Sequence, residues 1–218
     1  MDDAANTLER LDALTRLTWA GPSRRTEAPA SRGVLRRAGQ GEDGPGWWRP
    51  ASVRRFGGAP TPSEIVPWVQ CAFGEGGERP RFPSAGAIYG LELSAVMLPE
   101  GDVHRISPAG VLRPVHVEEP TVQDPGALFF HQLHGPCAVV VIDADLDAYA
   151  TAYDLRGYRY LLLEAGHLGQ ELIRASSLDG WSSCPIGAFW DDGVRRTLAL
   201  GLTHRAPVYA LAVGRNGC

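Results

Sequence analysis

The chain has 218 residues and a mass of 23.5 kDa, and 44% of its residues are hydrophobic, which is enough for one soluble domain with its own core. All 21 basic residues are arginine. The absence of lysine excludes Schiff-base chemistry, a lysine base and a phosphate-loop lysine, and the net charge of −4 argues against a general nucleic-acid-binding protein.

The cysteines and the N-terminal segment indicate the compartment. Cys71, Cys137, Cys184 and Cys218 form no Cys-x-x-Cys pair. The first twenty residues have no apolar core, and no apolar run approaches the ~18 residues that a membrane span requires. We therefore expect a reduced, cytoplasmic protein that inserts into no membrane.

The N-terminal part of the chain differs in composition from the remainder. Asn6 can cap a short helix that carries a leucine stripe over residues 8–17. Residues 21–46 are rich in Gly, Pro, Ser and Arg and show almost no apolar periodicity, which is typical of a linker or a surface arm. The arginines of this arm either remain solvated or hold an acidic partner. We divide the chain into this arm, residues 1–46, and one folded domain, residues 47–218.

A helix is predicted near the start of the folded domain. Thr61 to Glu64 form an N-terminal capping sequence, with Pro62 at the first helical position and glutamate at the third, and Gly74 ends the helix. Pro67 interrupts this pattern, which predicts a kink or a later start.

Strands and helices are mixed over the remainder of the chain. We predict strands over residues 91–98, 103–106, 111–117, 137–142 and 208–213, and helices over 157–178 and 191–200. The long helix is apolar nearly all round in its first half, so we expect it to be central and buried. Residues 182–189 are interpreted as a crossing between two helices. This pattern indicates an α+β domain.

Two segments carry residues suited to hold a ligand. The small-residue turn Arg81–Ala87 can present amides and a hydroxyl to an anion or a flat ring, or it can simply turn the chain. Ser52, Arg54 and Arg55 supply a hydroxyl and two guanidinium groups that suit a phosphate, although exposed arginines usually bind nothing specific.

Three further features have competing interpretations. His131, His134 and Cys137 have a spacing that suits a metal, but no fourth ligand is near, so we assign no metal site. Cys184 is interpreted as a packed thiol rather than a nucleophile, because no histidine is near it in sequence. His167 lies within the long predicted helix and is interpreted as a core histidine rather than a catalytic one.

The order of several motifs along the chain is similar to that of one known family. The motifs are Ser52–Phe56, Pro83–Glu92, Arg156–Arg159, Glu164–Gln170, Cys184–Phe189 and Pro207–Gly214. Together they resemble the SagB-type dehydrogenases, which are FMN-dependent oxidases of the nitroreductase superfamily. The resemblance covers roughly residues 47–215.

This resemblance implies an α+β, nitroreductase-like fold in which helices flank a central, mostly antiparallel sheet. It also implies a homodimer that holds FMN in a cleft between its protomers. Ser52, Arg54 and Arg215 would contact the FMN phosphate, with Arg49 taking the role of the family arginine that falls on Pro50. The ring would be lined by Pro83, Ser84, Ala85 and Gly86 and covered at its reactive edge by Ile186, Gly187 and Ala188.

The function that the resemblance implies is the oxidation of a thiazoline or oxazoline during peptide natural-product biosynthesis. Hydride would pass to flavin N5, and oxygen would reoxidise the flavin. A Lys-Tyr pair often serves proton transfer in the family, and the matching residues here are Ala152 and Tyr153. Tyr153 is therefore the candidate catalytic residue, although its ordinary pKa of ~10 makes it a poor base. Arg156 cannot replace the lysine because its guanidinium stays protonated.

Two alternatives remain open at this point. The missing lysine and the arginine-rich arm suit a non-catalytic partner subunit that scaffolds an active relative or a peptide. The second alternative is an NAD(P)H-dependent reductase of nitro compounds or quinones. The expected partners are a small heterocycle or a modified peptide, a second copy of the chain and a second biosynthetic protein, but no nucleic acid and no membrane.

Overall fold

A computed structural model describes residues 51–74, 79–116, 123–201 and 204–217. The predicted N-terminal arm, Arg49 and Cys218 lie outside the described residues. Among the helices of the described part, none is both long enough and apolar enough to cross a membrane.

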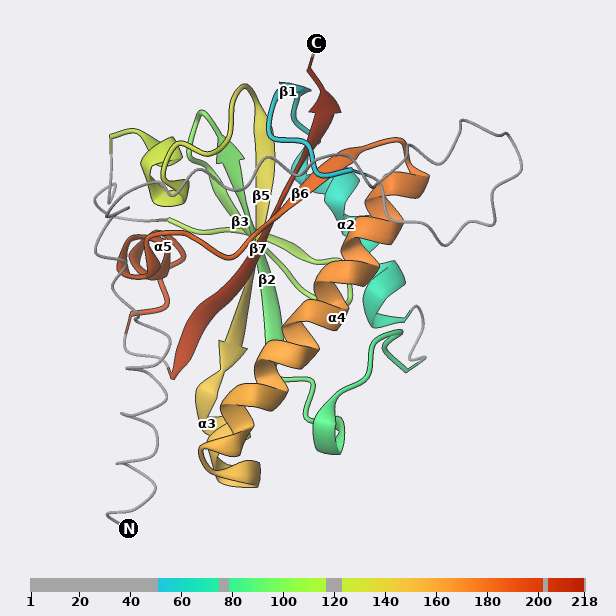
Figure 1. The fold of residues 1–218 in the computed structure, drawn as a ribbon, viewed down its shortest axis with the longest axis vertical. Coiled ribbons are helices and arrows are strands. Elements are labelled where there is room, and N and C mark those ends of the chain that lie inside the picture. Colours follow the sequence, from blue (N-terminus) through green and yellow to red (C-terminus); the bar gives the residue numbers. More distant parts are fainter. Residues whose placement is uncertain (1–50, 75–78, 117–122, 202–203, 218) are drawn as a thin grey trace, which may run out of the picture.

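A seven-stranded sheet forms the centre of the domain (Figure 1). Its strands follow the order β1-β7-β5-β2-β3-β4, and β6 also pairs with β7. All of these pairings are antiparallel, which confirms the predicted α+β fold with a mostly antiparallel sheet. The strands are β1 (Phe56–Gly58), β2 (Leu91–Leu98), β3 (Val103–Ile106), β4 (Leu112–Pro114), β5 (Cys137–Asp145), β6 (Ser182–Ile186) and β7 (Arg205–Asn216).

Helices cover both faces of this sheet. In Figure 1, α4 crosses one face with α2 beside it, and α5 lies on the opposite side. Of two short 3₁₀ turns, η2 lies between α2 and β2, and η3 lies between β4 and β5. The elements are α2 (Pro62–Phe73), η2 (Ala85–Ala87), η3 (Pro125–Phe129), α3 (Leu146–Tyr153), α4 (Arg156–Leu178) and α5 (Asp191–Thr197).

Strand β5 separates two hydrophobic cores. Its side chains point alternately to the two faces: Val140 and Ile142 pack with α2 and α4, whereas Val139 and Val141 pack with η3 and α5. Because both faces are covered, the strand is apolar without alternation, as the sequence predicted.

The predicted capping sequence begins α2. The Glu64 amide donates to Thr61 Oγ1, and the Thr61 amide donates to Glu64 Oε2 at 2.8 Å, which closes a capping box. The helix begins at Pro62 and continues through Pro67, so the later start is not observed.

Several predicted boundaries are wrong. Residues 182–186 form strand β6 rather than a crossing between helices, because Ser182 to Ile186 pair along β7 from Gly214 to Ala210. Of the predicted strand over 111–117, the described residues 111–116 form a strand only at Leu112–Pro114, and α5 ends at Thr197 rather than residue 200. Helix α3 was not predicted. It begins where the Asp145 carboxylate accepts a hydrogen bond from the Ala148 amide.

Helix α4 lies on the sheet but is not enclosed. Leu161 is fully buried, whereas Leu162 and Leu163 are 40% and 54% exposed, so the prediction of an all-round buried helix is wrong. The buried side approaches its neighbours through glycine: a Cβ on Gly169 would lie 2.4 Å from the Tyr209 ring, and one on Gly157 would lie 2.4 Å from the Tyr149 carbonyl oxygen.

Candidate functional site

The loop Ser84–Gly90 is held in an unusual backbone conformation. Gly86, Ala87 and Tyr89 all have positive φ angles of 63°, 55° and 48°, and two of these residues are not glycine. The Tyr89 amide donates to Ser84 Oγ at 3.0 Å, and the Gly90 amide donates to Tyr149 Oη at 3.3 Å. Such strain persists only where surrounding contacts fix the backbone, and it is common at functional sites.

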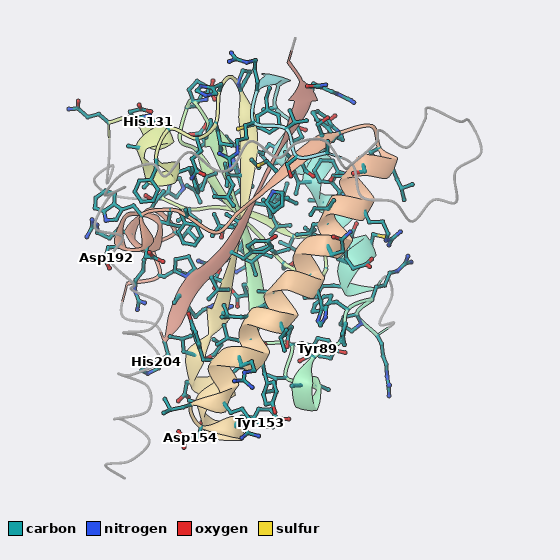
Figure 2. All side chains as sticks on the ribbon, viewed as in Figure 1. Tyr89, His131, Tyr153, Asp154, Asp192 and His204 are labelled. Atoms are coloured by element: carbon teal, nitrogen blue, oxygen red, sulfur yellow. The ribbon has the colours of Figure 1, made fainter. Side chains whose placement is uncertain are left out.

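Tyr153 lies against this loop. A Cβ placed on Gly86 would lie 2.6 Å from Tyr153 Oη, so the hydroxyl contacts the loop only because residue 86 is glycine. The Tyr153 ring is half-buried at the end of α3 and meets the edge of Tyr160, with ring centroids 4.8 Å apart. Figure 2 shows Tyr153 and Tyr89 at the lower end of the view, on the same side of the sheet as α4. The predicted ring-lining loop and the predicted catalytic residue are thus brought together.

Glu164 is a buried acid on the same side of the sheet. Its side chain is 1% exposed, and burial raises its pKa, while the hydroxyl groups of Ser84 and Tyr149 lower it. These hydroxyls face the carboxyl group, but neither contact meets hydrogen-bond geometry, so both carboxyl oxygens lack a full partner within the described residues. Glu164 had no predicted role. Its signal was an acid on the buried stripe between Leu161 and Leu168.

A buried ion pair anchors the end of the loop. The Arg205 guanidinium donates to Asp143 Oδ1 and also to the Gly90 carbonyl oxygen at 3.2 Å. Asp143 is fully buried, and this burial raises its pKa to about 6 against the opposing attraction of Arg205. Arg205 also lies 3.5 Å from the Glu92 carboxylate.

The predicted phosphate-binding residues gather at the other end of the sheet. Gly58 of β1 pairs with Arg215 of β7, and the Val53 amide donates to the Ser183 carbonyl oxygen at 3.0 Å. Ser52 and Arg54 are exposed on this segment. The Arg215 guanidinium donates to the Gly180 carbonyl oxygen at 3.0 Å and lies 3.8 Å from the centre of the Trp181 ring.

The predicted reactive-edge segment follows β6. Ile186 is buried, whereas Gly187 and Ala188 are exposed, and a Cβ on Gly187 would meet no atom within 4 Å. The Ala188 carbonyl oxygen accepts a hydrogen bond of 2.7 Å from the Gln132 side chain. An exposed glycine with open space above it leaves room for a flat ring to approach the backbone.

One chain does not bring all of the predicted residues together. Gly90 lies beside Arg205 at one end of β7, and the phosphate-binding group lies beside Arg215 at the other (Figure 1). At about 3.3 Å per residue, these two ends are about 33 Å apart. An FMN molecule is shorter than this, so it cannot touch both ends of the same sheet.

The remaining candidates have ordinary explanations. The His131 ring lies 3.6 Å from the Asp124 carboxylate in an exposed turn, and Cys137 is buried in β5, where burial raises its pKa to about 12. No three His, Cys, Asp or Glu side chains of the described residues are arranged to hold a metal ion. Cys184 is packed in the core, but His167 is exposed on α4, so its interpretation as a core histidine is wrong.

Comparison with known proteins identifies the family. The model of the nitroreductase family matches residues 51–215. The chain belongs to the nitroreductase family. This nitroreductase-family chain is also 28% identical over 175 residues to the Methanocaldococcus jannaschii protein MJ1384. The aligned region covers 76% of the present chain and 86% of that protein.

Solved structures share the fold at low sequence identity. A chain of the E. coli microcin synthetase McbBCD complex, with truncated pro-MccB17 bound, superposes with a TM-score of 0.73 at 17% identity, covering 98% of this chain and 94% of that one. A protein from Exiguobacterium sibiricum in complex with FMN has a TM-score of 0.55 at 14% identity, covering 77% of this chain and 85% of that chain. At these identities the comparisons establish the nitroreductase fold.

Proposed function

We propose that the protein is an FMN-dependent oxidoreductase that oxidises a thiazoline- or oxazoline-type ring in a modified peptide. The observation that carries this proposal is the contact between Tyr153 Oη and Gly86. It places a side chain that can carry a proton against the strained loop of small residues that is proposed to line the cofactor ring. The bound pro-peptide of the microcin synthetase complex is the model for the substrate class.

The residues present fit FMN in two ways. Ser52, Arg54 and Arg215 supply a hydroxyl and two guanidinium groups, which suit a phosphate at the β1–β7 end of the sheet. Gly187 and Ala188 supply exposed backbone with open space above it, which suits the ring. When bound, the flavin would accept hydride and pass electrons to oxygen. The FMN complex of a protein with the same fold supports this choice of cofactor.

Proton transfer is assigned to Tyr153. Its hydroxyl reaches the Ser84–Gly90 loop, so a proton can pass between it and a substrate held in direct contact there. Ala152 stands at the family lysine position and contributes no charge. Pro83, Ser84 and Ala85 would hold the substrate side of the ring in place through the loop that carries Gly86.

A homodimer would complete this site. Residues at the two ends of one sheet are about 33 Å apart, so a single FMN would take its phosphate ligands from one protomer and the Ser84–Gly86 loop from the other. The exposed side of α4, with Leu162 and Leu163, offers apolar surface for such a contact.

The experiment uses the purified full chain. We expect a yellow protein that releases FMN, and an azoline peptide that bleaches the flavin under anaerobic conditions without added nicotinamide. Tyr153→Phe should slow this bleaching at least tenfold, whereas Tyr160→Phe, which alters the neighbouring ring of the same aromatic pair, should not.

Three results would contradict the proposal. A colourless protein that takes up no FMN would favour a partner subunit. Faster flavin reduction by NAD(P)H than by any azoline would favour a nitro or quinone reductase. An unchanged rate in Tyr153→Phe would remove the role assigned to that hydroxyl.

A further inference from the structure

The segment Phe129–His134, which we call the brace, connects two parts of the chain that are distant in sequence. At one side, Gln132 Nε2 donates to the Ala188 carbonyl oxygen at 2.7 Å and to the Phe129 carbonyl oxygen at 3.0 Å. Both distances are those of good hydrogen bonds. The amide group of Gln132 therefore links the brace directly to the segment after β6.

The other side of the brace is bonded to the segment that carries Arg54. The His134 amide donates to the Arg54 carbonyl oxygen at 2.9 Å, and the Phe56 amide donates to the His134 carbonyl oxygen at 2.8 Å. Gly135, with φ +81°, lies so close that a Cβ would be 2.1 Å from the Phe56 carbonyl oxygen. The backbone beside Arg54 is thus fixed by the brace.

The brace is itself fixed by its local structure. Phe130 and His131 are consecutive non-glycine residues with φ of 51° and 50°, a conformation that persists only when neighbouring contacts impose it. Phe129 is fully buried, and the Leu128 carbonyl oxygen before it accepts a hydrogen bond from the Trp190 amide at 2.8 Å. The fixed backbone of this tight turn therefore orients the Gln132 side chain toward Ala188.

The bonded carbonyl lies in a short exposed stretch between two buried residues, Ile186 and Phe189. Gly187 and Ala188 are exposed, and the space above Gly187 is open. Glycine also permits a wide range of backbone conformations. A hydrogen bond to the Ala188 carbonyl oxygen therefore restricts the one link between β6 and α5 where a ring would meet the backbone.

We propose that Gln132 is a positioning residue that holds the Gly187–Ala188 backbone against the flavin ring, while the same brace holds the Arg54 segment against the phosphate. This inference rests on the proposed FMN binding. It gives the His131-Gln132-Leu133-His134 sequence a role other than metal binding. The side-chain amide of Gln132 donates to the Ala188 carbonyl oxygen, so the carboxylate of a glutamate at position 132 would repel that oxygen.

The test compares Gln132→Glu and Gln132→Leu with Gln70→Leu in the full chain. Gln70 is the matched control, because its side chain also donates to a backbone carbonyl oxygen in a loop, that of Ala109 at 3.2 Å. We expect both Gln132 variants to bind FMN about fivefold more weakly, because the loss corresponds to about one hydrogen bond. We also expect both variants to shift the flavin midpoint potential. Amide hydrogen exchange over residues 186–190 should rise in the apoprotein. Gln70→Leu should change none of these.

The outcomes separate this inference from the proposed function. If the wild-type protein binds no FMN, the proposed function fails, but amide exchange over residues 186–190 still tests the brace. If the Gln132 variants lower only the urea midpoint of unfolding, and leave exchange, FMN affinity and potential like those of Gln70→Leu, the inference is overturned.

Discussion

Replacing Arg205 by leucine tests how the loop end is held. Asp143 is fully buried, its Oδ2 has no hydrogen-bond partner within the described residues, and Arg205 is the cation bonded to its Oδ1. The variant leaves a buried carboxylate without its partner, which costs about 3–5 kcal/mol of unfolding free energy. It also removes the hydrogen bond to the Gly90 carbonyl oxygen. We expect FMN affinity to fall with stability.

The pH dependence separates charge from packing. Burial raises the pKa of Asp143 from its ordinary 3.8 to about 6, a difference worth about 3 kcal/mol. The folded state keeps this proton to higher pH than the unfolded state, so the wild type loses stability as pH rises from 3.8 to about 6 and then levels off. Without Arg205 the pKa rises further. The cost of Arg205→Leu should therefore be larger at pH 8 than at pH 4.5.

Urea unfolding followed by circular dichroism measures these costs. In the Asp143→Asn background, Arg205→Leu should cost less than half as much, because no buried charge remains. Arg174→Leu is the matched control: it breaks a partly exposed pair with Glu171 and should cost under about 1 kcal/mol. An Arg205→Leu cost that is equal at both pH values, and unchanged by Asp143→Asn, would show that the loss is one of packing.

Two further substitutions test Gly86 in the loop and the buried acid Glu164 of α4. Gly86→Ala places a side chain at φ +63° and 2.6 Å from a hydroxyl, so we expect it to cost about 1–2 kcal/mol and to weaken FMN binding, whereas Gly166→Ala, in open space on a helix, should be neutral or stabilising by urea unfolding and FMN titration. Burial raises the pKa of Glu164 above its ordinary 4.5, so the wild type loses stability as pH rises above that value. Glu164→Gln should remove this loss and raise the urea midpoint at pH 8 but not at pH 4. An equal change at both pH values would contradict the assignment.

The sequence predicted those elements whose signals are local. The capping box at Thr61 begins α2, and the apolar run of β5 needs only its own side chains to be recognised. Strand β6 could not be found in this way. Ser182 and Pro185 have low strand propensity, and the strand exists because β7 offers an edge to pair with. The exposure of Leu162 and Leu163 likewise depends on which side of α4 meets the sheet.

The site was predicted as separate segments. The small residues of the turn indicated that Gly86 tolerates a close approach, and the family resemblance gave Tyr153 its expected role in proton transfer. Their contact depends on how α3 packs beside the loop. Gln132 was missed because its neighbours are histidines, which drew the interpretation toward a metal. Its role depends on a bond to Ala188, 56 positions away in sequence, and no spacing rule detects such a contact.

The effect of the missing family lysine on proton transfer can be tested by introducing a lysine at that position. Ala152 is exposed at the end of α3, next to Tyr153, so Ala152→Lys adds an ammonium group without disturbing the core. A nearby positive charge stabilises the phenolate form of a tyrosine relative to its neutral form. If Tyr153 is the proton-transfer group, the variant should oxidise an azoline peptide faster at neutral pH and reach half-maximal rate at lower pH.

The matched control for this gain is Thr151→Lys, which adds the same charge to the neighbouring exposed position of the helix. Its side chain leaves α3 in a direction about 100° away from that of residue 152. The two variants therefore have the same net charge but place the ammonium group at different distances from Tyr153. Equal effects of both variants would mean that the charge acts only by attracting substrate. A gain confined to Ala152→Lys, and lost when Tyr153→Phe is added, would place the proton at the tyrosine hydroxyl.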